Sequence, residues 1–160
     1  MASAPAPLRI VTPSAQLRQP ALTSLEDGFM ARANAHIGTT NFATTIRMGG
    51  GRTLVADEPA ALGGADAGPA PYDLLLASLG ACTAITLRMY AERKQWSLQA
   101  VDIDLHHVKV ENRSKIERVI TLTGDLSADQ RARLADIAER TPVTLTLKAG
   151  ADIATRLSDG

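Results

Sequence analysis

The chain has 160 residues, close to the size of one average domain, and its apolar content of 45% is ordinary for a globular protein. Its 17 basic and 17 acidic residues balance and only 3% of its residues are aromatic, so we expect binding neither to nucleic acid nor to a membrane surface. The single cysteine, Cys82, excludes an intrachain disulfide, and with only three histidines we expect no metal and no cofactor. A lone thiol suits a reducing compartment, so we expect a cytoplasmic protein.

Residues 1–26 are expected to form a flexible N-terminal tail, because they are rich in alanine, proline and serine and lack the apolar segment of a secretory signal. A transit peptide is the alternative. Residues 27–160 are expected to form a single domain. The longest apolar run, residues 74–87, is shorter than a membrane-spanning helix, so we interpret it as a core helix.

The first predicted element is a β-hairpin. Residues 42–47 are rich in β-branched side chains, glycines 49–51 form a turn, and residues 52–56 return. A loop rich in glycine and proline then leads to a helix predicted over residues 72–94. The first two-thirds of that helix is apolar nearly all round, which indicates burial on most sides.

A second hairpin follows. Apolar residues alternate over residues 101–105, and the alternation then shifts to Val108 and Val110, which predicts either a bulge or an exit of the strand from the core near His106 and His107. The returning strand is residues 116–123, with Ile116, Arg118, Ile120 and Leu122 on one face.

Ser127 and Gln130 have the spacing of a capping box and predict the start of a second helix, which ends before Pro142. Residues 145–147 are ambiguous, and residues 151–155 are expected to form a last short strand. The predicted fold is therefore α+β, in the order ββ-α-ββ-α-β with a long buried central helix. An intertwined homodimer would account for a helix that is apolar on every face.

Cys82 is the one nucleophile that stands out, and its plainest interpretation is a small apolar core residue. A second interpretation arises because two hydroxyls flank the thiol on a helical face that is otherwise apolar. The residues of this face are Leu75, Ser78, Leu79, Ile85, Thr86 and Met89. The face would hold an alkyl or aryl group beside the sulfur while Ser78 or Thr86 forms a hydrogen bond. Alternatively, both hydroxyls bond to helix carbonyls one turn earlier.

A working thiol must ionise, and a free cysteine, with a pKa of about 8.5, carries little thiolate at neutral pH. The helix dipole does not help, because Cys82 lies well beyond the first turn of its helix. A cation must therefore lie nearby. Arg88 points away from Cys82, so Arg47 and Arg52 on the first hairpin are better candidates, and we assign the catalytic role to Arg47. The alternative is that both are surface charges.

The sequence around Cys82 resembles the OsmC-like (OsmC/Ohr) family. The specific part of the match is the run from Pro71 to Ala91, which contains Gly80-Ala81-Cys82. Weaker matches are Asp57-Glu58-Pro59, Gly63-Gly64, Gly68-Pro69, His107-x-Lys109, Ile116-x-Arg118, Gly124-Asp125-Leu126, Leu134-x-x-Ile137-Ala138 and Pro142-Val143. The likeness covers about residues 40–156.

The resemblance implies an α+β homodimer with two thiol sites at the subunit interface. The better-studied members are thiol peroxidases that reduce organic hydroperoxides. By this match Cys82 corresponds to their peroxidatic cysteine, which an arginine keeps ionised. A second cysteine of the family resolves the sulfenic acid.

Two departures from the family pattern affect the mechanism. Thr141 precedes Pro142-Val143 where the family usually has its second cysteine, so a resolving thiol is absent and an external thiol reductant would be required. The peroxidase branch also has a glutamate ten positions before the cysteine, where this chain has Tyr72 with Asp73 beside it. The residues that we assign to substrate binding are Tyr72, Asp73, Ser78 and Thr86.

Three functions remain open at this point. The first is an organic hydroperoxide reductase with one cysteine. The second is a non-catalytic member of the family that binds a small apolar ligand at the dimer interface. In the third, Cys82 has a structural role only.

Overall fold

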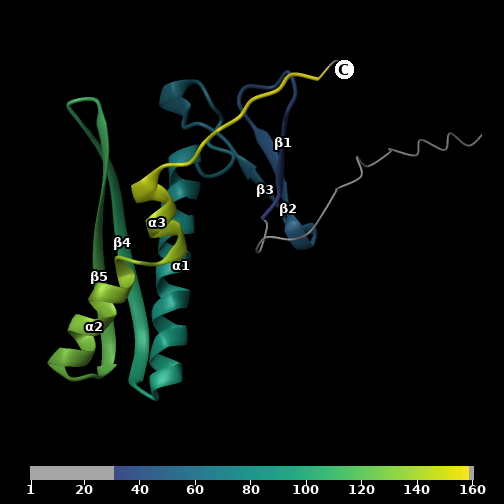
Figure 1. Ribbon diagram of the computed structural model, residues 1–160. Coiled ribbons are helices and arrows are strands. Elements are labelled where there is room, and N and C mark those ends of the chain that lie inside the picture. The colour runs from purple at the N-terminus through teal and green to yellow at the C-terminus, as the bar shows by residue number, and fades with distance from the viewer. Residues whose placement is uncertain (1–30, 159–160) are drawn as a thin grey trace, which may run out of the picture. The chain divides into compact units, whose positions relative to one another are not determined.

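The computed structural model describes residues 31–158, and its elements follow the order βββ-α-ββ-α-α (Figure 1). The predicted α+β class is therefore confirmed. The expected tail, residues 1–26, lies outside the described residues.

The first sheet is antiparallel and has the order β1-β2-β3, with β1 Ala33–Ile37, β2 Thr44–Met48 and β3 Thr53–Ala56. The glycines at 49–51 connect β2 to β3, which confirms the first predicted hairpin. Strand β1 was not predicted. Its sequence, ANAHI, alternates apolar and polar residues as a strand would, but all five residues are exposed in the structure.

Asp57 organises the loop between β3 and the long helix. Its buried carboxylate accepts backbone hydrogen bonds from Phe42 (3.2 Å) and Glu58 (2.8 Å) through Oδ1. Through Oδ2 it accepts further bonds from Ala65 (3.0 Å) and Ala67 (3.1 Å). The bond from Ala67 is the largest of the effects that lower the pKa of Asp57, and the other three act in the same direction against the opposing effect of burial.

Helix α1 extends over Pro71–Lys94. Proline suits its first position, and Asp73 Oδ2 accepts a hydrogen bond from the Ala70 N–H at 3.0 Å, which satisfies a free donor at the helix start. The helix ends at Gln95, whose left-handed backbone (φ 56°) stops the helical hydrogen bonding.

Two opposite faces of α1 are apolar, and only one is covered by the described chain. The covered face consists of Leu79, Thr83, Leu87 and Ala91. The face about 200° away around the helix, which we call the open stripe, consists of Ala77, Ala81, Ile85 and Met89. Ile85 and Met89 are 58% and 56% exposed. The burial that the sequence predicts on both faces is therefore complete on one face only.

A long antiparallel hairpin, β4 Ser97–Val110 and β5 Arg113–Asp125, packs against α1 (Figure 1). The register is regular at His106 and His107, so there is no bulge there, and the alternative is confirmed: the strand leaves the core, since residues 108–110 are all exposed. The irregularity lies between Leu98 and Ala100 instead. Because the alternation continues through His107, this histidine faces the same side of β4 as Leu105, and Val108 faces the opposite side.

Helix α2, Ala128–Ala138, begins at the predicted capping box, in which the Ser127 hydroxyl and the Gln130 amide each bond to the other's backbone. Leu134 and Ala138 of α2 join a core with Leu87, Ala91, Leu98 and Leu126.

The C-terminal segment corrects the prediction. Residues 142–149 form a helix, α3 Pro142–Ala149, which settles the ambiguous residues 145–147. Residues 151–155 pair with no described strand, and Ile153 is 89% exposed. A segment with suitable strand residues forms no strand without a neighbouring edge to bond to.

By length and apolar composition alone, α1 resembles a helix that could cross a membrane. The core helix of a globular protein meets the same criterion. Leu87 and Ala91 are fully buried in the core with α2 and β4, so one face of α1 belongs to the core.

Candidate functional site

Cys82 lies on α1 between the covered face and the open stripe. It is one position after Ala81 of the stripe and one position before the fully buried Thr83, so its side chain points about 100° from each. The thiol is free and partly exposed. A molecule that covers the open stripe would therefore meet the sulfur at its edge.

The two hydroxyls that flank Cys82 differ in availability. Thr86 Oγ1 donates to the backbone carbonyl of Cys82 at 2.7 Å, so its proton is already used within the helix. Ser78 is exposed, and its hydroxyl has no hydrogen bond to a described residue. Of these two predicted substrate-binding residues, Ser78 has the hydroxyl that is free to donate.

Arg47, the predicted catalytic arginine, lies on β2 with an exposed side chain. Within residues 31–158 it makes no side-chain hydrogen bond or ion pair, either to Cys82 or to any other residue. Two other arginines are engaged elsewhere. Arg88 donates to the carbonyls of Leu98 and Gln99, and Arg52 Nη1 donates to the carbonyl of Gly49 at 3.1 Å.

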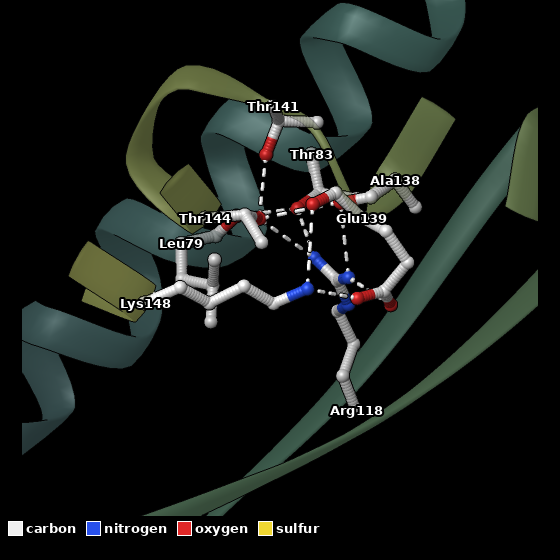
Figure 2. Close-up of polar contacts among 8 residues, drawn as sticks. All are labelled: Leu79, Thr83, Arg118, Ala138, Glu139, Thr141, Thr144 and Lys148. Atoms are coloured by element: carbon white, nitrogen blue, oxygen red, sulfur yellow. Dashed lines mark hydrogen bonds and ion pairs between the residues drawn. The ribbon is translucent and has the colours of Figure 1, made fainter. Parts of the chain in front are cut away.

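Arg118 is the centre of a polar network that joins three helices to β5 (Figure 2). Its side chain is only 10% exposed. Nη1 donates to the hydroxyls of Thr83 on α1 (2.9 Å) and Thr144 on α3 (3.1 Å). Nη2 donates to the carbonyl of Ala138 and to Glu139 Oε1, both at 3.0 Å. The buried cation is thus held by four acceptors, as a buried charge requires.

Glu139 binds a second cation in the same network (Figure 2). Lys148 Nζ donates to its Oε2, and this bond is the largest of the effects that lower the pKa of Glu139, with Arg118 adding to it. One carboxylate is therefore bound to two cations, so Arg118, Lys148 and Glu139 together carry one positive charge in excess.

Thr141, which the sequence resemblance aligns with the family's second cysteine, is fully buried. Its hydroxyl oxygen lies 2.7 Å from that of Thr144, which links it to the Arg118 network. Threonine therefore occupies this position as a hydrogen-bonding residue in the core. Neither Thr83 nor Thr141 carries a thiol, so the network offers no redox partner to Cys82.

A cavity of about 560 Å³ lies between α1, the β4–β5 hairpin and α3, a size typical of small-molecule sites. Its lining residues are Tyr72, Leu75 and Leu79 from α1, His107, Ser114, Ile116 and Arg118 from the hairpin, and Glu139, Thr144, Leu147 and Lys148 from the C-terminal segment. Cys82 is not among them.

Of the two predicted residues Tyr72 and Asp73, only Tyr72 lines the cavity. The Tyr72 ring stacks on His107 with centroids 4.3 Å apart at the cavity wall. Asp73 is exposed and caps α1, so the structure gives it a role in helix termination. The Nε2 atom of His107 is buried and has no hydrogen-bond partner, the one such side-chain atom within residues 31–158.

The sequence analysis did not single out Arg118 as a site residue, although the sequence pattern allows that prediction. This arginine stands in the apolar row of its strand, between Ile116 and Ile120, where an outward-facing cation would not be expected. A charged residue in a buried row indicates a paired site. Lys148 and Glu139 carried no comparable signal, because both are exposed helix-end residues in the sequence pattern.

Comparison with known proteins identifies the family to which the chain belongs. The family model for OsmC-like protein matches residues 63–156, more than half of the chain. The chain therefore belongs to the OsmC-like family, as the resemblance in the sequence implied. None of the curated proteins is a significant match.

Solved structures of the family share the fold. The organic hydroperoxide resistance protein OsmC of Legionella pneumophila has 22% identity and a TM-score of 0.57, covering 77% of this chain and 92% of that one. OhrB of Bacillus subtilis, an organic hydroperoxide resistance protein, has 23% identity and a TM-score of 0.55, with coverage of 78% and 94%. An OsmC-like protein of Mycoplasma pneumoniae has 17% identity and a TM-score of 0.65, with coverage of 75% and 88%.

Proposed function

We propose that this protein is a thiol-dependent hydroperoxide reductase that uses Cys82 alone. The observation that carries the proposal is the position of Cys82, a partly exposed thiol beside an apolar stripe. The sequence resemblance aligns this residue with the family's peroxidatic cysteine. The chain's structural neighbours include proteins described as organic hydroperoxide resistance proteins. An alkyl hydroperoxide would place its peroxide group at the sulfur, at the edge of the stripe.

In the proposed reaction the Cys82 thiolate attacks the terminal oxygen of the hydroperoxide. An S–O bond forms and the O–O bond breaks, so Cys82 is oxidised to a sulfenic acid and the hydroperoxide is reduced to an alkoxide, which takes a proton and leaves as the alcohol. Thr141 cannot resolve the sulfenic acid. An external thiol would attack the sulfur and release water, and a second thiol would break the mixed disulfide and restore Cys82.

We further propose that the active form is a homodimer in the cytoplasm. The open stripe of α1 supports a second copy of the chain, because apolar side chains exposed in a row favour burial. Arg47 is the cation that we propose for the thiolate. Arg88, Arg52 and Arg118 already donate to other groups, whereas Arg47 has no partner among the described residues.

The Cys82→Ser variant tests the proposed chemistry. With cumene hydroperoxide and dithiothreitol, we expect the wild type to consume peroxide and the variant to lose at least about a hundredfold in rate, because a serine hydroxyl does not replace the thiolate. Intact mass spectrometry of the reduced wild type after a short peroxide pulse should show a gain of one oxygen that dithiothreitol reverses.

Ser78→Ala serves as the matched control on the same helix and should remain within about tenfold of the wild type, the loss expected for one hydrogen bond. Equal peroxide consumption by the wild type and Cys82→Ser would refute the proposal. A wild-type thiol that stays unmodified by peroxide but can be alkylated after unfolding would refute it as well.

Ile85→Glu tests the homodimer. Placed at the centre of the open stripe, a glutamate would bring two unpaired charges into a symmetric interface, so we expect the dimer dissociation constant to rise at least about a hundredfold. Sedimentation equilibrium measures this directly. Thr121→Glu, on the exposed side of β5, should leave the dimer intact. A monomeric wild type would contradict the proposal.

The cavity favours a second candidate function, the binding of a small apolar ligand. Leu75, Leu79, Ile116 and Leu147 give it apolar walls, and Cys82 lies outside it. This function requires no turnover at the thiol. It predicts that a ligand raises the melting temperature of Cys82→Ser as much as that of the wild type.

A further inference from the structure

We propose that the cavity between α1, the β4–β5 hairpin and α3 binds an amphipathic carboxylate, with the carboxylate at Lys148 and the alkyl or aryl body against the apolar walls. The proposal deepens the ligand binding suggested above, and it does not depend on chemistry at Cys82.

The two ends of the cavity are fixed by the strand register. Ser114, Ile116 and Arg118 alternate along β5, so their side chains lie on one face about 7 Å apart. His107 is opposite Ile116 in the hairpin, and Arg118 binds Thr83 further along α1. The cavity therefore has His107 and Ser114 towards one end and the Arg118 network at the other.

The apolar side chains lie between these ends. Leu75 and Leu79 are one helical turn apart on α1 and line the same wall, while Ile116 and Leu147 line it from the hairpin and from α3. A chain that extends from the Arg118 network towards His107 would remove these four side chains from water. The body of the ligand is therefore expected to be apolar.

The charge at the network end favours an anion. Glu139 is the only carboxylate among the lining residues, and it already accepts bonds from both Arg118 and Lys148. Arg118 has used both Nη atoms, but Lys148 has a third N–H: its other two bonds go to the carboxylate and to the backbone carbonyl of Glu139. Its side chain is 56% exposed, so a ligand can reach it. A carboxylate would accept this bond and balance the excess charge.

The opposite end adds an independent observation. His107 lines the cavity, and its buried Nε2 has no partner. An unsatisfied buried nitrogen is costly, so its presence points to a polar group that completes the site. A ligand with a hydroxyl or keto group at its far end would satisfy it after a small movement of Tyr72, which covers the His107 ring and is exposed on its other side.

The test compares octanoate with 1-octanol, which have the same chain length and differ in charge. Dissociation constants are measured by isothermal titration calorimetry at neutral pH on the full-length Cys82→Ser protein, so that thiol chemistry makes no contribution. We expect octanoate to bind about tenfold more tightly than octanol, the effect of one charge-assisted hydrogen bond. This preference should decrease as salt is added.

Lys148→Met should remove the preference for octanoate and leave octanol binding within about twofold. The control is Lys115→Met, since Lys115 is also an exposed lysine paired with a glutamate, Glu117, but lies on the opposite face of β5. It should retain the preference. Leu75→Phe, which fills the cavity, should weaken the binding of both ligands. This result would locate their binding site in the cavity.

Three results would overturn the proposal. The first is that the folded protein does not bind octanoate. The second is that octanoate binds equally tightly with and without the Lys148→Met substitution. The third is that Leu75→Phe leaves the affinity for octanoate unchanged. None of them bears on peroxide consumption by Cys82, which is measured separately. The two proposals can therefore fail independently.

Discussion

Arg118→Met is expected to lower the free energy of unfolding by about 2–3 kcal/mol. The methionine has a similar length and fills the space, so little of the loss comes from a cavity. The loss comes from the four hydrogen bonds of the guanidinium, which tie β5 to α1, to the end of α2 and to α3. Thr83 and Thr144 keep their bonds to backbone carbonyls, which limits the loss.

Urea denaturation followed by circular dichroism measures this effect, with Arg113→Met as the control. Arg113 is an exposed arginine at the start of the same strand, and its substitution should change the free energy of unfolding by less than about 0.5 kcal/mol. If the two variants were equally stable, the Arg118 network would not be a structural element of the fold. In that case, combining Arg118→Met with Thr144→Val should show no coupling free energy between the two positions.

Asp57→Asn is expected to lower the melting temperature at pH 7 by roughly 5–10 °C, as the loss of a buried group with several partners would. An asparagine keeps one oxygen for Phe42 and Glu58. Its NH₂ group, however, faces the N–H donors of Ala65 and Ala67 and can accept from neither. The loop that leads into α1 would lose its anchor.

The effect of Asp57→Asn should depend on pH in a defined direction. The folded-state pKa of Asp57 lies below its ordinary value of 3.8, so its contribution to stability is present above about pH 4 and is lost as the pH falls through the lowered pKa. The difference in melting temperature between wild type and variant should therefore be constant near neutrality and shrink in acid. Glu58→Gln alters a partly buried neighbour that receives no such set of bonds, so it should change neither the melting temperature nor its dependence on pH. A difference that persisted unchanged at pH 2 would contradict this account.

The sequence by itself determined the class of the protein and most of its elements. The run around Cys82 identified the family, and the apolar pattern of residues 72–94 predicted α1 to within one residue at its start. The alternation in the second hairpin and the Ser127 capping box were sufficient because these signals are local: side-chain period and terminal donors depend on neighbours along the chain.

The tertiary structure alone decided how these elements make sites. Strand β1 and helix α3 depend on what lies beside them, and so do the roles of Asp57 and Asp73, two acidic residues that bind backbone donors. Arg118 meets Thr83, which is 35 positions away in the chain, and Glu139, which is 21 positions away. No local pattern encodes such distances. The Arg118 network and the cavity therefore became visible only when packing brought distant segments together, since buried charges and unpaired nitrogens are defined by their surroundings.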